Sequence, residues 1–505
     1  MGTIRSLLLL ILIAAPTTAA AAEEPLALVQ ALERAIAGNP DLRRDRLTIE
    51  LRDAGIQAAQ GQFDFRLTSN LTFSRSTTPA ISGSDLQGGF TNNLALNLGL
   101  ARALESGGSL RLSVQDNASN TNARLQCGNS GADQSTCTFY NSGLSLNFTH
   151  PLLRGFGSEV AQANIRRNRV QKDQALLNRQ MRASNVMRDV VNGYWELAYA
   201  TQDLAIQRSA VELAREQLRI TQAQIEVGRL APVDAAAVER AIGDRMQTVV
   251  ASEQTLYFRT LDLRRLFGLA ADPEAAAFAA SDAPLASPRD VQVAAEVRHA
   301  LDVNPQLRAL KLGIKLSELD LATARSTLLP QLDFVGDVGS TGKKLARDRV
   351  EASAFSDAFK QAAGLDNLVW SAGLRLDVPL ENRVAKGQMR AAQVGEASAR
   401  LESGDFELEI RNQVLRLATM VRSASRRVEL AKATVGFATQ NLEAEKARFT
   451  VGRSTNNDVL LRQQELKSAE ISVVRATVDL LESETTLAAI TGELLERYGV
   501  VLKGL

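Results

Sequence analysis

The chain has 505 residues, of which 45% are hydrophobic and 5% aromatic, and its 58 Lys and Arg residues balance 57 Asp and Glu residues. The net charge of +1 excludes bulk electrostatic attraction as a basis for binding nucleic acid or a strongly acidic surface. The length suffices for several domains, but the sequence repeats internally, which favours two copies of one unit instead.

The first 22 residues are typical of a secretory signal peptide. Arg5 provides the positive end, Ser6–Ala15 the short apolar core, and Ala20–Ala22 the small-residue cleavage site. This apolar run is too short to span a membrane, and no later stretch approaches the length of a transmembrane helix. We therefore expect an exported protein from which residues 1–22 are removed.

The only two cysteines, Cys127 and Cys137, stand in a polar stretch rich in Asn, Ser and Gly. In an exported protein this spacing predicts a disulfide that closes a local loop. A metal site is less favoured because no His lies near them. Neither cysteine directly follows the signal peptide, so we expect no N-terminal lipid attachment.

A seven-residue apolar period occurs in both halves of the chain, and its second copy lies 224 positions after the first. The first copy includes Val190, Leu197, Leu204, Val211, Leu218 and Ile225, and the second includes Val414, Val421, Val428, Val435, Leu442 and Phe449. A period of seven sustained over this length is typical of long α-helices packed as a coiled coil. A glycine after each run, Gly228 and Gly452, predicts that the helices fold back as hairpins.

We expect long helices at about 158–226 and 384–450 and shorter partners at about 233–266 and 457–490. At about 1.5 Å per residue, the long helices would reach about 100 Å. An average globular helix has only three or four turns. Helices of this length are typical of a tunnel wall or a spanning rod.

The segment before the strands is repeated as well. Asn39-Pro40 reappears as Asn304-Pro305, and each pair separates a short helix from a longer one, expected at about 43–62 and 308–328. The mature chain is therefore predicted to consist of two structural repeats, residues 23–285 and 286–505.

Each half then changes to a period of two. Leu67, Leu71 and Phe73 alternate with hydroxyl and amide residues, Leu332 and Phe334 begin the matching segment, and further alternating runs end before a proline in each half. One interpretation is a sheet that lies on a soluble core. The interpretation we favour is a transmembrane β-barrel with lipid outside and a wet lumen inside, because an exported chain without an apolar helix can span a bilayer only in this way.

The first half contains an additional segment at about 86–120. It holds two more alternating runs, Leu94–Leu100 and Leu110–Val114, which are joined at Ser106–Gly108 and predict an inserted β-hairpin. The second half has a charged, helical loop at about Leu345–Ala363 in its place. We expect the insert to project from the sheet or pack aside, leaving four strands per copy; an insert that joins the sheet would give six.

The features that recur in both halves are specific when they are taken together and in order. They are the two Asn-Pro steps, the strand ends Pro151-Leu152-Leu153-Arg154-Gly155 and Val378-Pro379-Leu380, and the turn segments Val227–Asp234 and Phe449–Leu460. With these features the mature chain resembles, over essentially its whole length, the TolC family of outer-membrane efflux channels, the outer membrane factors of tripartite pumps.

The resemblance implies a mainly α-helical homotrimer with a transmembrane β section. Three copies would form one β-barrel of twelve strands, four per protomer, in the lipid of the outer membrane, and the long helices would continue it as a coiled-coil tunnel in the periplasm. A periplasmic adaptor (membrane fusion) protein would dock at the turns and connect the tunnel to an inner-membrane transporter of the RND, ABC or MFS class. Such a protein is a passive conduit for the efflux of small molecules.

Two alternatives remain open at the level of the sequence. A type I protein-secretion channel shares the same architecture. A soluble periplasmic coiled-coil scaffold would explain the helices and the signal peptide, but it would not explain alternating strands in equivalent places of both halves.

The resemblance also implies which residues would surround the narrow end of the tunnel. Asp234 and Asp458 occupy positions where acidic residues face the constriction, and rings of carboxylates favour cations and raise one another's pKa values. The alternative is that each Asp caps the helix that it begins. Capping is at least as well supported for Asp234, whereas for Asp458 we favour the constriction.

Two further constriction positions depart from the family pattern. Ser454 stands where some members have a locking arginine, and Phe449 stands where a locking tyrosine can occur. Phe449 has no hydroxyl to donate a hydrogen bond, and Leu461 replaces a second acidic residue. We therefore expect a more apolar closure.

The candidate adaptor contacts are the turns themselves, Gly228-Arg229 and Gly452-Arg453. Glycine permits a left-handed backbone and the close approach of another chain, and an exposed arginine adds a donor for partner oxygens. Ending the helix is the simpler role for each glycine.

Nothing in the sequence indicates catalysis. The two histidines, His150 and His299, stand alone, and no nucleophile, cofactor or metal constellation can be assembled on the repeat. We expect a protein that is not an enzyme and needs no cofactor or metal.

Overall fold

The computed structural model describes residues 24–79, 89–122, 136–272, 276–285, 291–347 and 351–500. The predicted signal peptide and Cys127 lie outside the described residues. The chain forms two compact units, and each draws on both sequence repeats. The first contains the described parts of Met1–Leu47, Leu177–Arg308 and Gly404–Leu505, and the second contains Thr48–Leu176 and Ala309–Ser403.

Helices account for most of the described residues, and the predicted long helices are confirmed. In chain order they are α1 (Leu28–Gly38), α2 (Pro40–Gln60), the 3₁₀ helix η1 (Gly61–Phe63), α4 (Ser158–Ala161), α5 (Ala163–Glu226), α6 (Pro232–Leu266), α7 (Val293–Val303), α8 (Pro305–Leu328), α9 (Ala352–Ala363), α10 (Arg383–Thr450), α11 (Asn456–Thr491) and α12 (Leu494–Arg497). The two longest, α5 and α10, have 64 and 68 residues.

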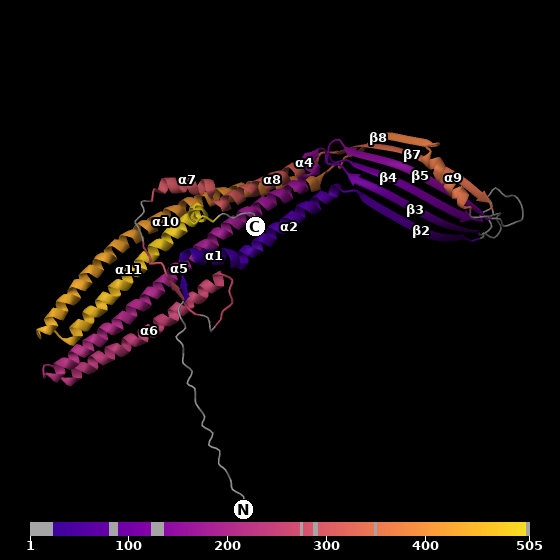
Figure 1. Ribbon diagram of the computed structural model, residues 1–505. Helices are drawn as coiled ribbons and strands as arrows, with labels where there is room; N and C mark the ends of the chain where they lie inside the picture. The colour runs from indigo at the N-terminus through magenta and orange to yellow at the C-terminus, as the bar shows by residue number, and fades with distance from the viewer. Residues whose placement is uncertain are drawn as a thin grey trace, which may run out of the picture. The chain divides into compact units, whose positions relative to one another are not determined.

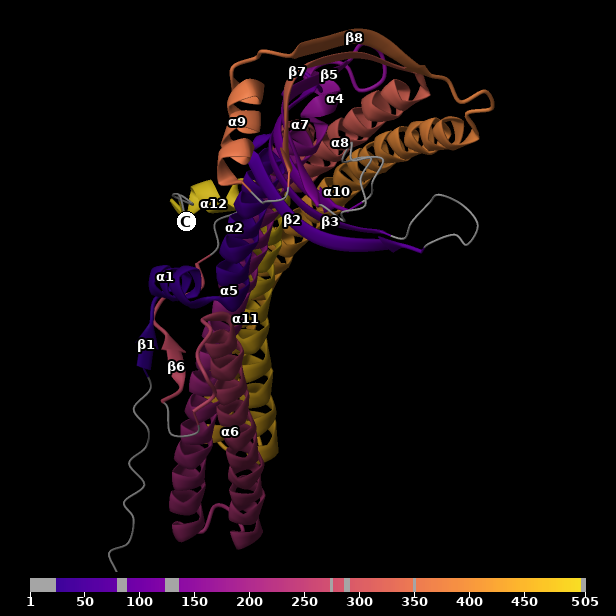
Figure 2. The same ribbon diagram turned by 90° about the vertical axis from the view of Figure 1, so that its right-hand side faces the viewer.

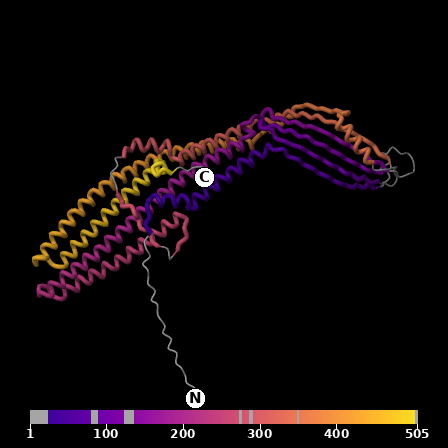
Figure 3. The backbone as a smooth tube through the Cα atoms, in the orientation of Figure 1, coloured from indigo at the N-terminus to yellow at the C-terminus, as the bar shows by residue number. Residues whose placement is uncertain are grey.

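The first unit is built on two helical hairpins, α5–α6 and α10–α11, whose arms run side by side (Figures 1 and 3). The predicted heptad positions are its core. Val190 and Leu197 are buried in a cluster with side chains of α1, α6 and α11, and Val414 and Val421 are buried in a cluster with α7 and α11. A short parallel pair, β1 (Glu24–Leu26) and β6 (Phe278–Ala280), completes this unit.

The second unit contains one antiparallel sheet in the order β2-β3-β4-β5-β7-β8. Its strands are β2 (Arg66–Thr78), β3 (Gly89–Ala103), β4 (Ser109–Thr121), β5 (Cys137–Pro151), β7 (Gln331–Arg347) and β8 (Leu368–Asp377). The predicted helix in the loop of the second half is α9, although β7 extends further than expected, to Arg347.

The expectation that the inserted hairpin stays outside the sheet is wrong. Its strands β3 and β4 pair along their whole lengths with β2 and β5, so the chain contributes six strands to one sheet. The physical reason is the register, which places Leu94 opposite Phe73 and Leu112 opposite Leu146 and so continues one apolar face without a break. A hairpin set aside would instead leave two strands with unpaired backbone groups.

The two faces of the sheet differ sharply in polarity. Directly paired residues share a face, and the register assigns one face a polar set that includes Thr72, Asn97, Gln115, Asn147 and Asp337. The other face carries most of the exposed large apolar side chains of the strands: Leu67, Leu71, Phe73, Leu94, Leu98, Leu100, Leu110, Leu112, Leu146, Phe334, Val338, Leu368, Trp370, Leu374 and Leu376. The sheet therefore has one predominantly apolar face, and among the described residues α9 packs on it.

None of the helices within the described ranges combines the length and the apolar character needed to cross a membrane.

Candidate functional site

The turn between α5 and α6 ends the helix with two backbone hydrogen bonds. The N–H of Gly228 donates to the carbonyl of Ile225 (2.9 Å), and the N–H of Arg229 donates to the carbonyl of Gln224 (2.8 Å). This pair is a Schellman motif, which requires a left-handed residue at its centre. Gly228 provides it with φ of 73°.

The turn between α10 and α11 repeats the same geometry. Gly452 donates to the carbonyl of Phe449 (3.0 Å), Arg453 donates to that of Arg448 (2.9 Å), and the φ of Gly452 is 74°. A Cβ atom added at either glycine would meet nothing within 4 Å. Both turns therefore present an uncovered backbone as well as a defined conformation.

The residues beside each glycine are exposed. Val227 and Val451 are each 69% exposed, and Arg229 and Arg453 also point into solvent. Each hairpin therefore ends in the same exposed tripeptide, Val-Gly-Arg, which we call the tip tripeptide. It offers an apolar contact, a backbone open to close approach and a guanidinium that donates to carbonyl or carboxylate oxygens.

Asp234 caps the helix that it begins. Its carboxylate accepts a hydrogen bond from the N–H of Ala231 at 3.1 Å, at the start of α6. Asp458 makes a reciprocal capping box with Thr455. Its Oδ2 accepts from the Thr455 N–H (3.1 Å) and hydroxyl (2.6 Å), while the Thr455 Oγ1 accepts from the Asp458 N–H (3.3 Å).

The capping box stabilises the ionised form of Asp458. Hydrogen bonds from the side chain and the backbone of Thr455 hold the pKa of the Asp458 carboxyl below its usual range. The capping alternative is therefore confirmed for both aspartates. Both carboxylates are also partly exposed, so capping leaves each of them accessible from solvent.

Phe449 is a packing residue in this structure. Its side chain is 4% exposed and packs in a cluster with Leu442 and Val459, against which Ile220 and Leu230 of the first hairpin also pack. The prediction that Phe449 lines a constriction is wrong for this reason: the seven-residue period that contains it directs the side chain inward. Ser454 is half-buried at the turn.

A buried polar contact that the sequence did not predict joins the two hairpins near their tips. The Oδ1 of Asn456 accepts hydrogen bonds from Gln217 Nε2 (2.7 Å) and Thr221 Oγ1 (2.9 Å). The three side chains are buried. Gln217 and Thr221 are four residues apart on one face of α5, which is the sequence signal that could have identified a shared partner.

A second such contact lies further along the hairpins. Arg245 of α6 is buried, and its Nη1 donates to the carbonyl of Ala210 (2.6 Å) and to Oε1 of Gln463 on α11 (3.1 Å). Burial lowers the pKa of Arg245. These contacts fix the two hairpins against each other within the first unit.

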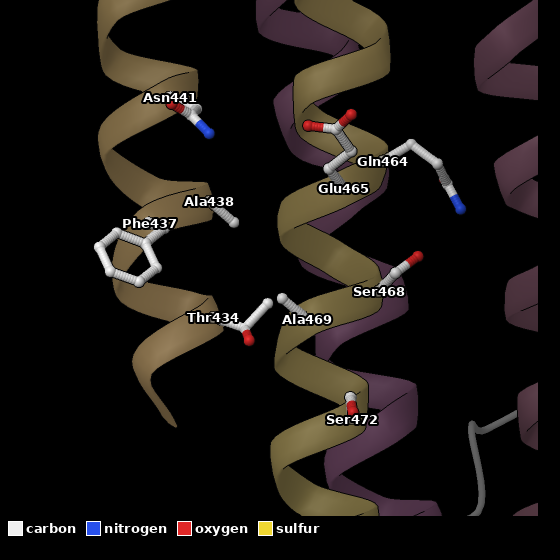
Figure 4. Close-up of a pocket in the computed structure, with 9 residues that line it drawn as sticks. All are labelled: Thr434, Phe437, Ala438, Asn441, Gln464, Glu465, Ser468, Ala469 and Ser472. Atoms are coloured by element: carbon white, nitrogen blue, oxygen red, sulfur yellow. The ribbon is translucent and has the colours of Figure 1, made fainter. Parts of the chain in front are cut away.

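A groove of about 520 Å³ lies between α10 and α11. Figure 4 shows Thr434 and Ala438 of α10 and Ala469 of α11 projecting into the space between the two helices. These side chains are small, so they leave room between the helices. Phe437, at the edge of the groove, is 65% exposed. The groove is lined partly by small side chains and has an aromatic side chain at its edge.

Other residues singled out in the sequence have structural places. His150 is the second-last residue of β5, and its Nε2 lies 3.0 Å from the hydroxyl of Ser106. Cys137 begins β5, but Cys127 lies outside the described residues, so their disulfide stays a prediction. In the part of the chain that the structure describes, no three His, Cys, Asp or Glu side chains are grouped as a metal site would need.

Comparison with known proteins shows what these features resemble. The sequence model of the outer membrane efflux proteins matches residues 297–493, which include the second hairpin and its tip. The chain is similar to this family over these residues. The matches support an efflux channel of the outer membrane and not an enzyme. They do not support the alternative of a soluble periplasmic scaffold.

Two characterised relatives extend the match. The chain is 24% identical over 372 residues to the alkaline protease secretion protein AprF of Pseudomonas aeruginosa, covering 71% of this chain and 70% of that protein. It is 21% identical over 317 residues to the outer membrane efflux protein BepC of Brucella suis, covering 61% and 64%.

Solved structures have the same fold. The outer-membrane channel OprN superposes with a TM-score of 0.63 at 14% identity, covering 92% of this chain and 89% of that one. VceC of Vibrio cholerae gives a TM-score of 0.63 at 13% identity, covering 92% and 96%. The resemblance to TolC-like channels is confirmed.

Proposed function

We propose that three copies of this efflux channel assemble with their sheets closed into one barrel in the outer membrane and their hairpins forming a tunnel in the periplasm. The alternation of an apolar face with a polar face supports a lipid-facing wall around a wet lumen. All residues of the two outermost strands, β2 and β8, are exposed in the single chain. Pairing between copies would satisfy these open edges.

The barrel would contain eighteen strands instead of twelve, because each chain contributes six. The direction of the strands permits the barrel to close. In a six-stranded antiparallel sheet β2 and β8 run in opposite directions, so β8 of one copy can pair with β2 of the next as antiparallel strands. The diameter of a barrel grows roughly with the number of strands. The opening in the membrane would therefore be wider than that of a twelve-stranded barrel.

The observation that supports a role as the outer-membrane part of a pump is the exposed tip tripeptide at both hairpins. In a trimer it would occur six times around the periplasmic end, which suits docking by a periplasmic adaptor (membrane fusion) protein. Gly228, Arg229, Gly452 and Arg453 are the proposed contacts. The groove between α10 and α11 lies on the same hairpin as one tip and would be a second contact for the same adaptor.

The proposed constriction consists of Asp234, Asp458 and Ser454, without Phe449. Three copies of each carboxylate around a narrow lumen would favour cations. The capping hydrogen bonds keep Asp458 ionised, which supports this role. The protein itself would be a passive conduit, driven by an inner-membrane transporter of the RND, ABC or MFS class.

Efflux of small molecules is the first candidate for transport, and it follows from the family. The second candidate is type I protein secretion, and the observation that favours it is the similarity to a protein named for secretion of an alkaline protease. Deletion of the gene separates the two candidates. Increased susceptibility to small toxic compounds supports efflux, and loss of a protein from the culture medium supports secretion.

The experiment that tests adaptor docking is photo-crosslinking in cells from a reactive amino acid at Arg453, followed by mass spectrometry. Arg422, which is exposed on α10 away from the tip, is the matched control position. We expect a periplasmic adaptor to be captured from position 453 and not from 422. Capture of the chain itself alone, at normal expression, would contradict the proposal.

A further inference from the structure

Helix α9 lies directly on one face of the sheet (Figure 2). Ala354 and Ala358 face the strands and are 7% and 0% exposed. The approach is so close that a Cβ atom at Gly342 of β7 would lie 1.8 Å from the carbonyl oxygen of Ala358. The contact also includes an edge-on pair of Tyr140 and Phe355, with ring centroids 6.4 Å apart.

The face that α9 covers is the apolar one. Tyr140 stands opposite Lys344 and opposite Ala118, and both pairs continue the face that carries the exposed leucines. Along β5 and β7, however, the large apolar side chains stop at the level where Leu144 is opposite Ser340, whereas β3 and β2 continue the band with Leu94 and Phe73. Helix α9 packs on the next pairs along β5 and β7, so it lies where the apolar band ends on these two strands, at the end of β7 remote from Gln331.

The residues under α9 are more polar than the band of leucines. Four side-chain oxygen atoms there are buried without a hydrogen-bond partner, those of Asp116, Tyr140, Ser142 and Ser340. Polar groups of this kind interrupt the apolar band on β4, β5 and β7. With α9 in place, this end of the face is covered and the outer surface is that of the helix.

The outer surface of α9 has an apolar side and a polar, charged side. Ala352, Phe355, Phe359 and Ala363 are spaced as a helical stripe, and the two phenylalanines are 41% and 43% exposed. The adjoining side carries Ser353, Ser356, Asp357 and Lys360, with Asp357 4.0 Å from the ammonium of Lys344. An exposed aromatic stripe beside a charged side is typical of a helix that lies in a membrane interface.

We propose that α9 is an interfacial helix, whose Phe355 and Phe359 insert among lipids at the headgroup boundary on the outer side of the membrane. The inference rests on the proposed function, in which the sheet spans the outer membrane. The partner that fits is a lipid surface, because the aromatic stripe continues the exposed apolar face and ends where polar residues begin. The helix would fix the depth of the barrel in the bilayer.

Quenching of single tryptophans by brominated phosphatidylcholine in vesicles tests this inference. The chain has two tryptophans, Trp195 and Trp370. The test variants carry Phe355→Trp or Phe359→Trp with Trp195→Phe and Trp370→Phe. Ser353→Trp in the same background is the control on the charged side. Trp370 alone, with Trp195→Phe, is the control on the apolar face of β8, where it is 70% exposed.

We expect tryptophan at 355 and 359 to be quenched more strongly by lipids brominated near the headgroup than by lipids brominated near the chain ends, and tryptophan at 353 to be quenched by aqueous acrylamide. The result that overturns the inference is quenching of 355 and 359 by acrylamide but not by lipid, while Trp370 is quenched by lipid. If Trp370 is also unaffected by lipid, the proposed membrane location of the sheet fails as well. The two test variants are separate proteins, so if one replacement prevents folding, the other still tests the inference.

Discussion

The side-chain amide of Asn304 donates a hydrogen bond of 3.1 Å to the backbone carbonyl of Ile490, next to the last residue of α11. The side-chain oxygen of Asn304 accepts hydrogen bonds from the N–H groups of Gln306 (3.0 Å) and Leu307 (3.1 Å) at the start of α8. One buried side chain thus caps a helix and binds the returning arm of a hairpin.

Asn39 repeats this arrangement in the first half. It donates to the carbonyl of Leu266 at the end of α6 (2.9 Å) and accepts from Asp41 (2.9 Å) and Leu42 (3.3 Å) at the start of α2. The duplicated Asn-Pro steps are therefore the two points where a hairpin arm is bound to the segment that leads to the sheet.

Replacement of Asn304 by Ala removes the cap and leaves the carbonyl of Ile490 buried without its partner. We expect the free energy of unfolding to fall by about 1–3 kcal/mol. The measurement is thermal unfolding in detergent, followed by circular dichroism. Asn441→Ala, at an exposed position of α10, is the control and should leave the transition unchanged. An equal effect of both variants would contradict the assignment.

A cluster of charged residues on α11 and α5 predicts that the stability of the chain depends on pH. Arg475 contacts Glu196 (2.6 Å), Asp479 (2.6 Å) and Glu482 (3.4 Å). Burial, and then the charge of Glu196, raise the pKa of Glu482 to about 7, against the opposing effect of Arg475. Between pH 4.5 and pH 7 the folded chain therefore retains a proton on Glu482 that the unfolded chain has already released.

This difference in pKa determines how the stability of the folded chain changes with pH. The pKa of Glu482 is about 7 in the folded chain and 4.5 as the ordinary value, so its contribution to stability is full below pH 4.5 and is lost as the pH rises through 7. Glu482→Gln should remove this loss and stabilise the chain above pH 7 by about 1 kcal/mol, a value reduced because the group is partly exposed. Denaturation by urea at a series of pH values measures it; parallel curves for the variant and the natural chain would refute it.

Phe449 predicts a local effect at the tips. Phe449→Ala opens a cavity in the cluster that joins both hairpins, with a cost of about 3–5 kcal/mol. We expect faster hydrogen exchange at the backbone amides of residues 442–466. Phe437→Ala, whose side chain is 65% exposed, is the matched control and should have little effect. Unchanged exchange in the first variant would show that Phe449 does not hold the tips together.

The proposed carboxylate ring predicts a change in ion selectivity. Asp458→Asn keeps an oxygen for the capping hydrogen bonds but removes the charge. In planar bilayers under a salt gradient, the reversal potential should shift towards lower cation selectivity, because the ring attracts cations. Glu465→Gln, on the same helix, is the control. Equal reversal potentials for Asp458→Asn and the natural chain would rule out a place for Asp458 in the constriction.

Local patterns predicted most of the helical part of the fold. The heptads of Val190 and Val414 and the glycines Gly228 and Gly452 located the hairpins to within a few residues, since helix period and turn chemistry are both encoded locally. The capping roles of Asp234 and Asp458 were equally local. Phe449 was misassigned because a family position was given more weight than its own heptad position, which directed it inward.

The long-range contacts were not predictable in the same way. Asn456 meets Gln217, and Arg245 meets Gln463, across separate hairpins, and no local period specifies such partners. The place of the inserted hairpin depended on pairing between strands that are distant in sequence. Its alternating leucines matched the apolar face of β2 and β5, and this match could have decided between four and six strands.

The open edges of the sheet lead to the last prediction. If β8 of one copy pairs with β2 of the next, residues in the middle of these strands come together only in the assembled ring. Thr72 and Ser371 both lie on the polar face and are exposed in the single chain. With the natural cysteines replaced by Ser, Thr72→Cys with Ser371→Cys and a flexible dimaleimide should give covalent dimers and trimers on a denaturing gel.

Asn97→Cys with Gln115→Cys provides the matched control, because these residues are directly opposite within one sheet and also lie on the polar face. This pair can link only within a chain, so it should migrate as a monomer under the same treatment. A ladder that ends at the trimer, together with six strands per chain, gives eighteen strands in the barrel. If Thr72 and Ser371 give only monomers while the control pair reacts fully, the edges of the sheet do not meet between copies and the barrel cannot close in this way.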